Sequence, residues 1–434
     1  MLARLILFCW FLRIVKPEWI ISHYIPSLGF IKGIPTLLTL AMLIGIVIGN
    51  KRVRWEWGIS LFIIIAATST IFSANRGVSI QIVRGLVELW ILAAATLTYI
   101  ETEKNIGKIF SIYLFAFIFF GIWGISGHGL ILAFMPLNNE DSFGPFMCMG
   151  ISMCYFISLN EEKWKRKVLW MGQYVCILGA IVSFARGTFI ALVAILIYIL
   201  LRTKKKKIFI LEMVICGIIG ISLILNFRPD FMKNYSAEMS TIWEEGEKEQ
   251  TANDRVFLWI KGLEMFLDNP FLGVGPGCYS FRLARYTSRM EAEEWGVNTQ
   301  IYGRHLHNIY IEVMAEMGFL GTVGLLAILI QFLRNNNFLR REKKVKLYKN
   351  EGNTIRFQET QTGRFRFWGL GLEGAMVGYL INGIFYNLLF FPWLWDLVIL
   401  NTIVFNLSKS FQGQLDSKEP RFPELYDSRK ILVD

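Results

Sequence analysis

Residues 304–332 read RHLHNIYIEVMAEMGFLGTVGLLAILIQF, and this stretch decides how the rest of the chain is interpreted. It opens with Arg304, His305 and His307 at the end of a long polar segment. From Ile309 to Phe332 it is predominantly apolar and long enough to cross a bilayer, which takes about 20 helical residues. We therefore expect both imidazoles at a membrane surface, where polar chain meets a membrane-spanning helix.

The composition of the 434-residue chain points to the same class of protein. Hydrophobic residues make up 54% of it, and its mean hydropathy is +0.44. The apolar residues come in blocks of span length, whereas a soluble domain interleaves them with charge. The alternating strands of a transmembrane barrel are missing from the sequence. We therefore predict an all-α polytopic membrane protein.

About twelve transmembrane helices are expected from the block lengths and the charged residues between blocks. They cover residues 2–16, 33–49, 57–73, 80–99, 107–126, 143–159, 168–184, 187–201, 208–227, 309–333, 366–389 and 392–408. The first block resembles a signal peptide, but no small-residue cleavage site follows it, so it is counted as a span. The predicted organisation is spans one to nine in 1–227, a polar loop in 228–308, spans ten to twelve in 309–408 and a tail in 409–434.

The net charge of +11 is concentrated in loops that should share one side of the membrane. By the positive-inside rule the cytoplasmic loops are Lys51–Arg54, Lys163–Lys167, Lys204–Lys207 and Arg334–Arg366. This distribution follows topology and does not indicate a nucleic-acid partner. The other side then carries Ser73–Ser79, Gly127–Ser142, Ser183–Gly187, Asn387–Trp393 and the long loop 228–308.

The long loop is slightly acidic, with nine Lys or Arg and twelve Asp or Glu, which suits an external position. The expected localisation is the inner, or plasma, membrane, with the site on the external, periplasmic face. The first part of the loop, 228–251, is polar and partly helical by pattern. Asn253-Asp254 should cap a helix over 255–267 that Asn269-Pro270 ends. This helix would lie on the membrane surface or pack on the spans.

The glycine run Gly273–Gly277 and the residues after it complete the loop. The run should form a bend, and no βαβ unit surrounds it, so it is not a nucleotide-binding loop. A second amphipathic helix is expected at about 278–294. It carries Arg282, Arg285 and Arg289 within about two turns, so these side chains can share one broad face.

Several of these motifs together resemble the O-antigen ligase and polymerase family. They are Asp254-Arg255 with Trp259, Asn269-Pro270 with the glycine run, and His307-Asn308 followed after nine residues by Gly318 and then by Gly321-Thr322. The ligase signature ends in Trp, whereas this chain has Val323. Ligase and polymerase therefore both remain open. The family also commonly has Ser-x-x-Arg-Gly where this chain has Ser183 to Gly187.

The resemblance implies a glycosyltransferase with a GT-C-like fold, and of the two forms we predict a ligase first and a polymerase as the alternative. Such an enzyme moves a glycan from undecaprenyl diphosphate, among membrane lipids, to a lipid A-core or another glycan or protein acceptor. It also implies no metal, no other cofactor and no nucleotide sugar.

The residues themselves fit that chemistry. A diphosphate leaving group needs cations, and arginine offers forked donors for it. An acceptor hydroxyl needs a general base, for which histidine is the usual choice. We predict His307 as the base of an inverting attack. We predict Arg186, Arg255 and Arg282 as diphosphate ligands, with Arg285, Arg304, His305, Asn308 and Glu316 as secondary site residues.

Each of these residues has a structural alternative. His307 could only satisfy backbone groups at a helix start, and Arg186 could snorkel at the interface. Arg255, placed at the start of the predicted helix, is disfavoured by the helix dipole unless an anion lies nearby; it could instead pair with Asp254. Glu316 could orient a glycan or only pack against a cation.

Other functions fit the same composition. A polymerase would join repeat units on the same carrier, and a related enzyme would glycosylate a protein. A secondary transporter would show inverted repeats and charges at the bilayer midplane, and we find no convincing repeat. No Cys or His spacing resembles a structural zinc site.

Overall fold

The computed structural model describes most of the chain. The described residues are 2–127, 137, 140–183, 185–204, 245–297, 303–341, 346–351, 354–359 and 362–416, with a few positions between 206 and 222. The predicted ninth span lies largely outside them. So do the first part of the long loop, most of the predicted turn at 127–142 and the end of the tail.

Long helices dominate the described residues, and each of them overlaps one of the predicted spans. They are α1 (Leu2–Val15), α3 (Ile34–Ile48), α4 (Trp57–Ile71), α5 (Arg76–Tyr99), α6 (Glu103–Ser126), α7 (Glu140–Ser158), α8 (Lys163–Val182), α9 (Arg186–Arg202), α15 (Ile309–Arg340), α16 (Thr362–Asn382) and α17 (Pro392–Asp416). The short helices α2 (Pro17–Tyr24) and η1 (Pro26–Gly33) join α1 to α3. Among the described helices, four stretches are long and apolar enough to cross a membrane: Pro26–Ile48, α5, α6 and α15. The chain is a multi-pass membrane protein.

Local sequence explains where several helices begin. The side chains of Asn75 and Thr102 accept hydrogen bonds from the N–H groups of Val78 and Asn105, and so cap α5 and α6. Pro392 stands at the start of α17, where its missing N–H costs nothing. Each signal lies in a predicted turn between spans, so the sequence itself sets these helix ends.

Small residues bring α7, α9 and α16 close together. A Cβ added at Gly374 of α16 would collide with Ser152 of α7, and one at Gly378 would collide with Ile195 of α9. In a membrane such close approach supplies the packing that holds helices together, because lipid is as apolar as the helix surface. This packing holds α9 and α16 side by side. Two segments of the site adjoin them: the start of α9 at Arg186 and the turn that follows the end of α16 at Asn382.

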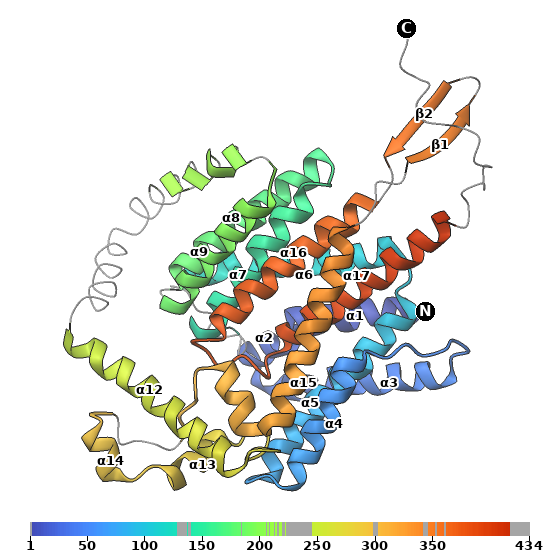
Figure 1. The fold of residues 1–434 in the computed structure, drawn as a ribbon. Helices are drawn as coiled ribbons and strands as arrows, with labels where there is room; N and C mark the ends of the chain where they lie inside the picture. Colours follow the sequence, from blue (N-terminus) through green and yellow to red (C-terminus); the bar gives the residue numbers. More distant parts are fainter. Residues whose placement is uncertain are drawn as a thin grey trace, which may run out of the picture.

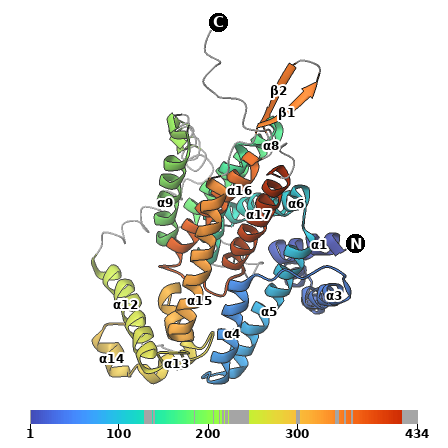
Figure 2. The ribbon, with the colours of Figure 1, turned by 45° about the vertical axis from the view of Figure 1, so that its right-hand side comes forward.

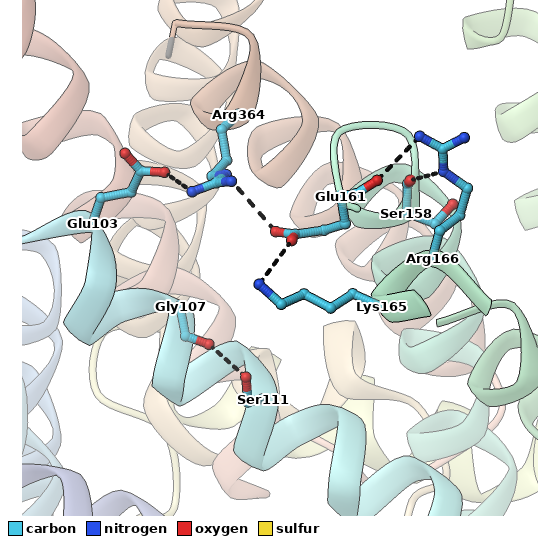
Figure 3. A network of polar contacts seen from close by, with 8 residues as sticks. All are labelled: Glu103, Gly107, Ser111, Ser158, Glu161, Lys165, Arg166 and Arg364. Atoms are coloured by element: carbon cyan, nitrogen blue, oxygen red, sulfur yellow. Dashed lines mark hydrogen bonds and ion pairs between the residues drawn. The ribbon is translucent and has the colours of Figure 1, made fainter. Parts of the chain in front are cut away.

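An ion-pair network joins helix ends that were predicted to be cytoplasmic (Figure 3). Arg364 of α16 pairs with Glu103 of α6 and, at 3.7 Å, with Glu161 just before α8. Lys165 of α8 also approaches Glu161, at 3.7 Å. These ends therefore lie on one face of the bundle, as the charge distribution predicts.

A short hairpin leaves the same end of the bundle and departs from the all-helical expectation. Strands β1 (Lys346–Glu351) and β2 (Thr354–Glu359) are antiparallel, with Lys346 opposite Glu359. Apolar and polar residues alternate through Ile355 to Gln358, which favours a strand over a helix. At the opposite end of the bundle lie the helices of the long loop (Figures 1 and 2).

The helices of that loop differ from the predicted ones. The first, α12 (Glu245–Asp268), begins ten residues before the predicted start, so Asn253 and Asp254 lie inside it and do not cap it. It ends before Asn269-Pro270, as predicted. The expected second helix is two helices, α13 (Tyr279–Tyr286) and α14 (Arg289–Glu294). The chain restarts at Ser288, whose Oγ accepts a hydrogen bond from the N–H of Glu291 at 3.1 Å.

Two predicted spans are also corrected. The eleventh ends at Asn382 and not at 389, and an irregular turn over 383–391 connects α16 to α17. The tenth, α15, is longer than expected and is interrupted at Gly318, which has φ 65° and ψ −158°. Both departures shape the site.

Candidate functional site

The turn 383–391 is where segments distant in sequence meet. The backbone N–H of Ile309, the first residue of α15, donates to the carbonyl of Gly383 at 2.7 Å. Asn387 Nδ2 lies 3.3 Å from His305 Nδ1. Phe385 packs on Gly187 of α9, where an added Cβ would meet its side chain at 2.8 Å. The turn thus joins the start of α9 to the start of α15.

His305 and His307 lie in the extended segment that precedes α15. The predicted start of this span is confirmed, because α15 begins at Ile309 and both histidines lie before it. His307 has φ 52°, a left-handed conformation that costs a non-glycine residue free energy and is concentrated at functional sites. Asn308 is the cap of α15: its Oδ1 accepts hydrogen bonds from the N–H groups of Tyr310 at 3.0 Å and Ile311 at 3.1 Å. Asn308 therefore has a structural task in placing His307.

The electrostatic surroundings keep His307 neutral at physiological pH. Burial, together with the charges of Arg255, His305 and Arg304, lowers the pKa of His307 from 6.5 to about 4. Burial also lowers the pKa of His305. A neutral imidazole can accept a proton, so the residue predicted as a base is in the protonation state that a base needs.

Arg255 lies in the middle of α12 and not at its start. The proposed conflict with the helix dipole is therefore removed, because α12 begins at Glu245. The Arg255 guanidinium lies 6.0 Å from the centroid of the Phe385 ring, a cation–π distance. The other structural explanation for Arg255 was an ion pair with Asp254. In the structure the Asp254 carboxylate pairs with Arg304.

Asp254 pairs with Arg304. The two Arg304 nitrogens lie 2.7 and 3.3 Å from the two carboxylate oxygens, a forked ion pair across 50 residues of sequence. Trp259 Nε1 donates to the carbonyl of Leu306 at 3.1 Å. Helix α12 is thereby fastened to both sides of His305, which sets the position of the histidines against Arg255.

Arg186 is the first residue of α9, next to the Gly187 that packs on Phe385. The exposed N–H groups of a helix start favour an anion, and an arginine at the same place adds to that preference. Arg186, Arg255, Arg304, His305 and His307 therefore gather around the turn 383–391; we refer to them as the Arg–His cluster. This part of the predicted site is assembled by the fold.

The arginines of α13 and α14 lie elsewhere. Arg282 lies close to Tyr286. Burial and Asp268 raise the pKa of Tyr286, and Asn269 and Arg282 partly offset that rise. Asp268 lies thirteen residues beyond Arg255, roughly 20 Å along α12. Arg285 is exposed, and Arg289 pairs with Glu293 at 2.9 Å in solvent. The described contacts thus place Arg282 toward the far end of α12, away from the cluster.

Glu316 holds the glycine run in place. Its two carboxylate oxygens accept hydrogen bonds from the backbone N–H groups of Gly277 at 2.6 Å and Tyr279 at 3.0 Å. The side chain is 3% exposed. The sequence predicted that Glu316 orients a glycan or packs against a cation. The observed contacts are instead with backbone N–H groups of the loop.

The interruption of α15 at Gly318 also contacts the loop that contains the glycine run. At Gly318 a Cβ would lie 2.5 Å from the backbone of Phe271, and the positive φ also favours glycine. The loop backbone replaces the missing helical hydrogen bonds: Phe319 N donates to Pro270 O at 2.7 Å, and Val274 N donates to Ala315 O at 2.9 Å. The half of α15 that follows His307 is therefore locked to the glycine run.

Replacing Glu316 with alanine should lower the free energy of unfolding by roughly 2–6 kcal/mol, because two backbone donors lose their acceptor at about 1–3 kcal/mol each. Denaturation in mixed micelles would measure this change. The matched control is Glu293→Ala, since the exposed pair with Arg289 should contribute about 1 kcal/mol or less. A Glu316→Ala protein of unchanged stability that had lost activity would instead point to a substrate contact.

Sequence reasoning missed Phe385 and Asn387. It placed the turn Asn387–Trp393 on the external side but gave it no role, and it put Phe385 inside a span. Hydropathy gives no sign that the turn begins as early as residue 383, because the apolar residues of this segment are buried against the bundle. Among the described residues no three His, Cys, Asp or Glu side chains gather as metal ligands. The cluster offers donors suited to an anion.

Fold and site together define a multi-pass helical membrane protein with an anion-directed Arg–His cluster at one end of its bundle. Residues 172–326 match the protein family described as O-Antigen ligase. A stretch of 127 residues is 27% identical to the exopolysaccharide production protein ExoQ of Rhizobium meliloti (strain 1021). That match covers 29% of this chain and 26% of the relative. The chain therefore carries the O-antigen ligase and polymerase family region, as its motifs predicted, and this region contains the whole Arg–His cluster.

Proposed function

We propose that this protein is a glycosyltransferase that moves a glycan from a lipid-linked diphosphate to an acceptor hydroxyl at the external face of the plasma membrane. The observation that carries the proposal is the Arg–His cluster, in which Arg255 and Arg304 lie close enough to His307 to lower its pKa. A neutral base beside fixed cations suits a reaction in which a hydroxyl loses a proton and a diphosphate departs.

In this mechanism Arg186 and Arg255 bind the diphosphate of the donor, undecaprenyl diphosphate by family resemblance. His307 takes the proton of the acceptor hydroxyl as its oxygen attacks the anomeric carbon. The bond from that carbon to the phosphate oxygen breaks, and its electron pair leaves with the diphosphate, whose charge the arginines stabilise. Attack from the opposite face inverts the anomeric configuration.

Donor binding should also strengthen the base. In the free protein burial and, to a lesser extent, the arginine charges hold the pKa of His307 near 4, which makes the imidazole a weak base. A bound diphosphate would offset the arginine charges and raise the pKa by the part of the shift that those charges cause. The imidazole then becomes an effective proton acceptor only when the donor is in place.

The acceptor separates two forms of this function. The family name that matches residues 172–326 favours a ligase, which would transfer O-antigen or a similar polysaccharide to a lipid A-core. The similarity to an exopolysaccharide production protein favours a polymerase that lengthens carrier-linked chains. Val323 in place of the ligase tryptophan is in keeping with the second form. Donor binding and the role of His307 are the same in both.

A transfer assay tests the proposal. Purified protein is mixed with undecaprenyl diphosphate glycan and either lipid A-core or no added acceptor, and the products are separated by size. A glycan on lipid A-core identifies a ligase, and longer carrier-linked chains identify a polymerase. Carrier-linked glycan that only crosses the membrane of a proteoliposome, without a new glycosidic bond, would overturn the proposal in favour of transport.

A further inference from the structure

Helix α12 presents an apolar stripe to its surroundings. Val256, Leu263 and Leu267 are 43%, 39% and 72% exposed, and with half-buried Ile260 they follow the spacing of one helix face. Just beyond the end of α12, Phe271 is 70% exposed. An amphipathic helix in water turns its polar face outward, so this outward apolar stripe calls for an apolar neighbour.

The inner face of α12 is already occupied. Phe257, Leu258 and Met265 are buried with Tyr279 and Leu306 in a second core between α12, α13 and the start of α15. Lys261, on the same side, bridges Glu264 at 3.0 Å and Glu291 of α14 at 2.5 Å. The stripe is therefore the face left over after the helix has packed against the protein.

The stripe continues into the outward surface of a membrane span. Leu320 N donates to the carbonyl of Phe271 at 3.2 Å, so the end of the stripe lies beside α15. From this junction α15 shows its own exposed apolar row, formed by Phe319, Val323, Leu326, Ile330 and Leu333. This part of α15 belongs to a stretch with a mean hydropathy of 2.1 that qualifies as a membrane span. Figure 1 shows α12 running obliquely beside the lower part of α15.

We propose that the outward stripe of α12 docks on the lipid bilayer, with the helix lying at the boundary between headgroups and acyl chains of the outer leaflet. The occupant is lipid because the end of the stripe is hydrogen-bonded to α15, whose own exposed apolar row belongs to a helix long and apolar enough to span a membrane. Interfacial helices bury an apolar face at this depth. Arg255 lies on the same helix, so the docking sets this guanidinium at headgroup level; that it meets a lipid diphosphate there rests on the proposed function.

Nitroxide labels on cysteines at Leu263 and Leu267 test the docking. The protein is placed in nanodiscs of phosphatidylethanolamine and phosphatidylglycerol, and relaxation by oxygen is compared with relaxation by a water-soluble nickel complex. Leu326→Cys in α15 serves as the lipid reference and Arg289→Cys, whose side chain is 83% exposed on α14, as the aqueous reference. Wild type carried through the labelling gives the background of the native cysteines; those in the described part of the chain are buried.

Docking on lipid predicts an oxygen-to-nickel ratio at 263 and 267 several-fold above that at 289 and close to that at 326. Ratios equal to the aqueous reference would overturn it. Low access to both agents, or spin–spin broadening that vanishes when unlabelled protein is added, would place another protein or a second copy on the stripe and overturn it as well. The measurement needs no activity, so it can fail while the proposed transferase function stands.

Discussion

His307→Ala should lower glycan transfer by about 10²- to 10⁴-fold, the range that a positioned general base contributes. Protein level and stability should remain close to wild type, since the backbone around the residue is held by other contacts. Asn308 caps α15, and the Trp259 indole N–H donates a hydrogen bond to the carbonyl of Leu306. Initial rates at saturating donor and acceptor would measure the loss.

The pH dependence gives His307 a second signature. Its pKa is lowered to about 4 in the free protein, so kcat/KM should stay constant from neutral pH down to about pH 5 and fall as the imidazole gains a proton. The acid limb of kcat reports the donor complex, in which the diphosphate offsets the arginine charges. We therefore expect that limb at higher pH than the limb of kcat/KM.

His23→Ala is a matched control, because this exposed histidine lies on α2. It should transfer glycan like wild type. His305→Ala, which removes the contact with Asn387, should have a smaller effect than His307→Ala. Full activity in His307→Ala would exclude the general-base role, and an acid limb that persists unchanged in the residual activity would assign it to another group.

Arg255→Gln should lower kcat by about 10²- to 10³-fold, the usual loss when one donor to a developing negative charge is removed. It should also move the acid limb of kcat/KM to higher pH. The Arg255 cation is one of the groups that lower the pKa of His307, so its removal lets that pKa rise toward 6.5. A residue that only packed on Phe385 would not produce this shift together with the loss of rate.

Two further variants sharpen this result. Arg255→Lys keeps the charge but loses the forked geometry, so it should keep the acid limb near its original pH while recovering only part of the rate. Arg289→Ala removes a solvent-exposed arginine of the same loop and should leave both quantities unchanged. A wild-type rate in Arg255→Gln would remove this residue from diphosphate binding.

The spans were predictable because a bilayer imposes a length and a composition on each helix. The predicted span 187–201 is observed as α9 from Arg186 to Arg202, and the predicted span 33–49 is observed as α3 from Ile34 to Ile48. The same argument failed at the end of α16. Residues 383–391 remain apolar because they are buried in the bundle, and hydropathy does not distinguish a buried turn from a helix.

The long loop was harder to predict. Asn253-Asp254 has the composition of a helix cap, but α12 continues through it. The Asp254 side chain instead forms an ion pair with Arg304. The single predicted helix that carried all three arginines of 278–294 divides at Ser288, which separates Arg289 from Arg282 and Arg285. A cap-like pair of residues or a continuous amphipathic pattern predicts helix ends only weakly. Packing against spans far away in the sequence can override both.

By itself the sequence determined the class of protein, the sides on which its loops lie relative to each other, and the motif of His307, Asn308 and Gly318. These features depend on the length of apolar blocks, on charge and on local spacing, all of which are written along the chain. Only the tertiary structure decided that Phe385 and Asn387 join Arg186 and Arg255 around the histidines, and that Glu316 holds the glycine run. These contacts cross 37 to 198 residues and arise from how helices pack, which leaves no periodic trace in the sequence.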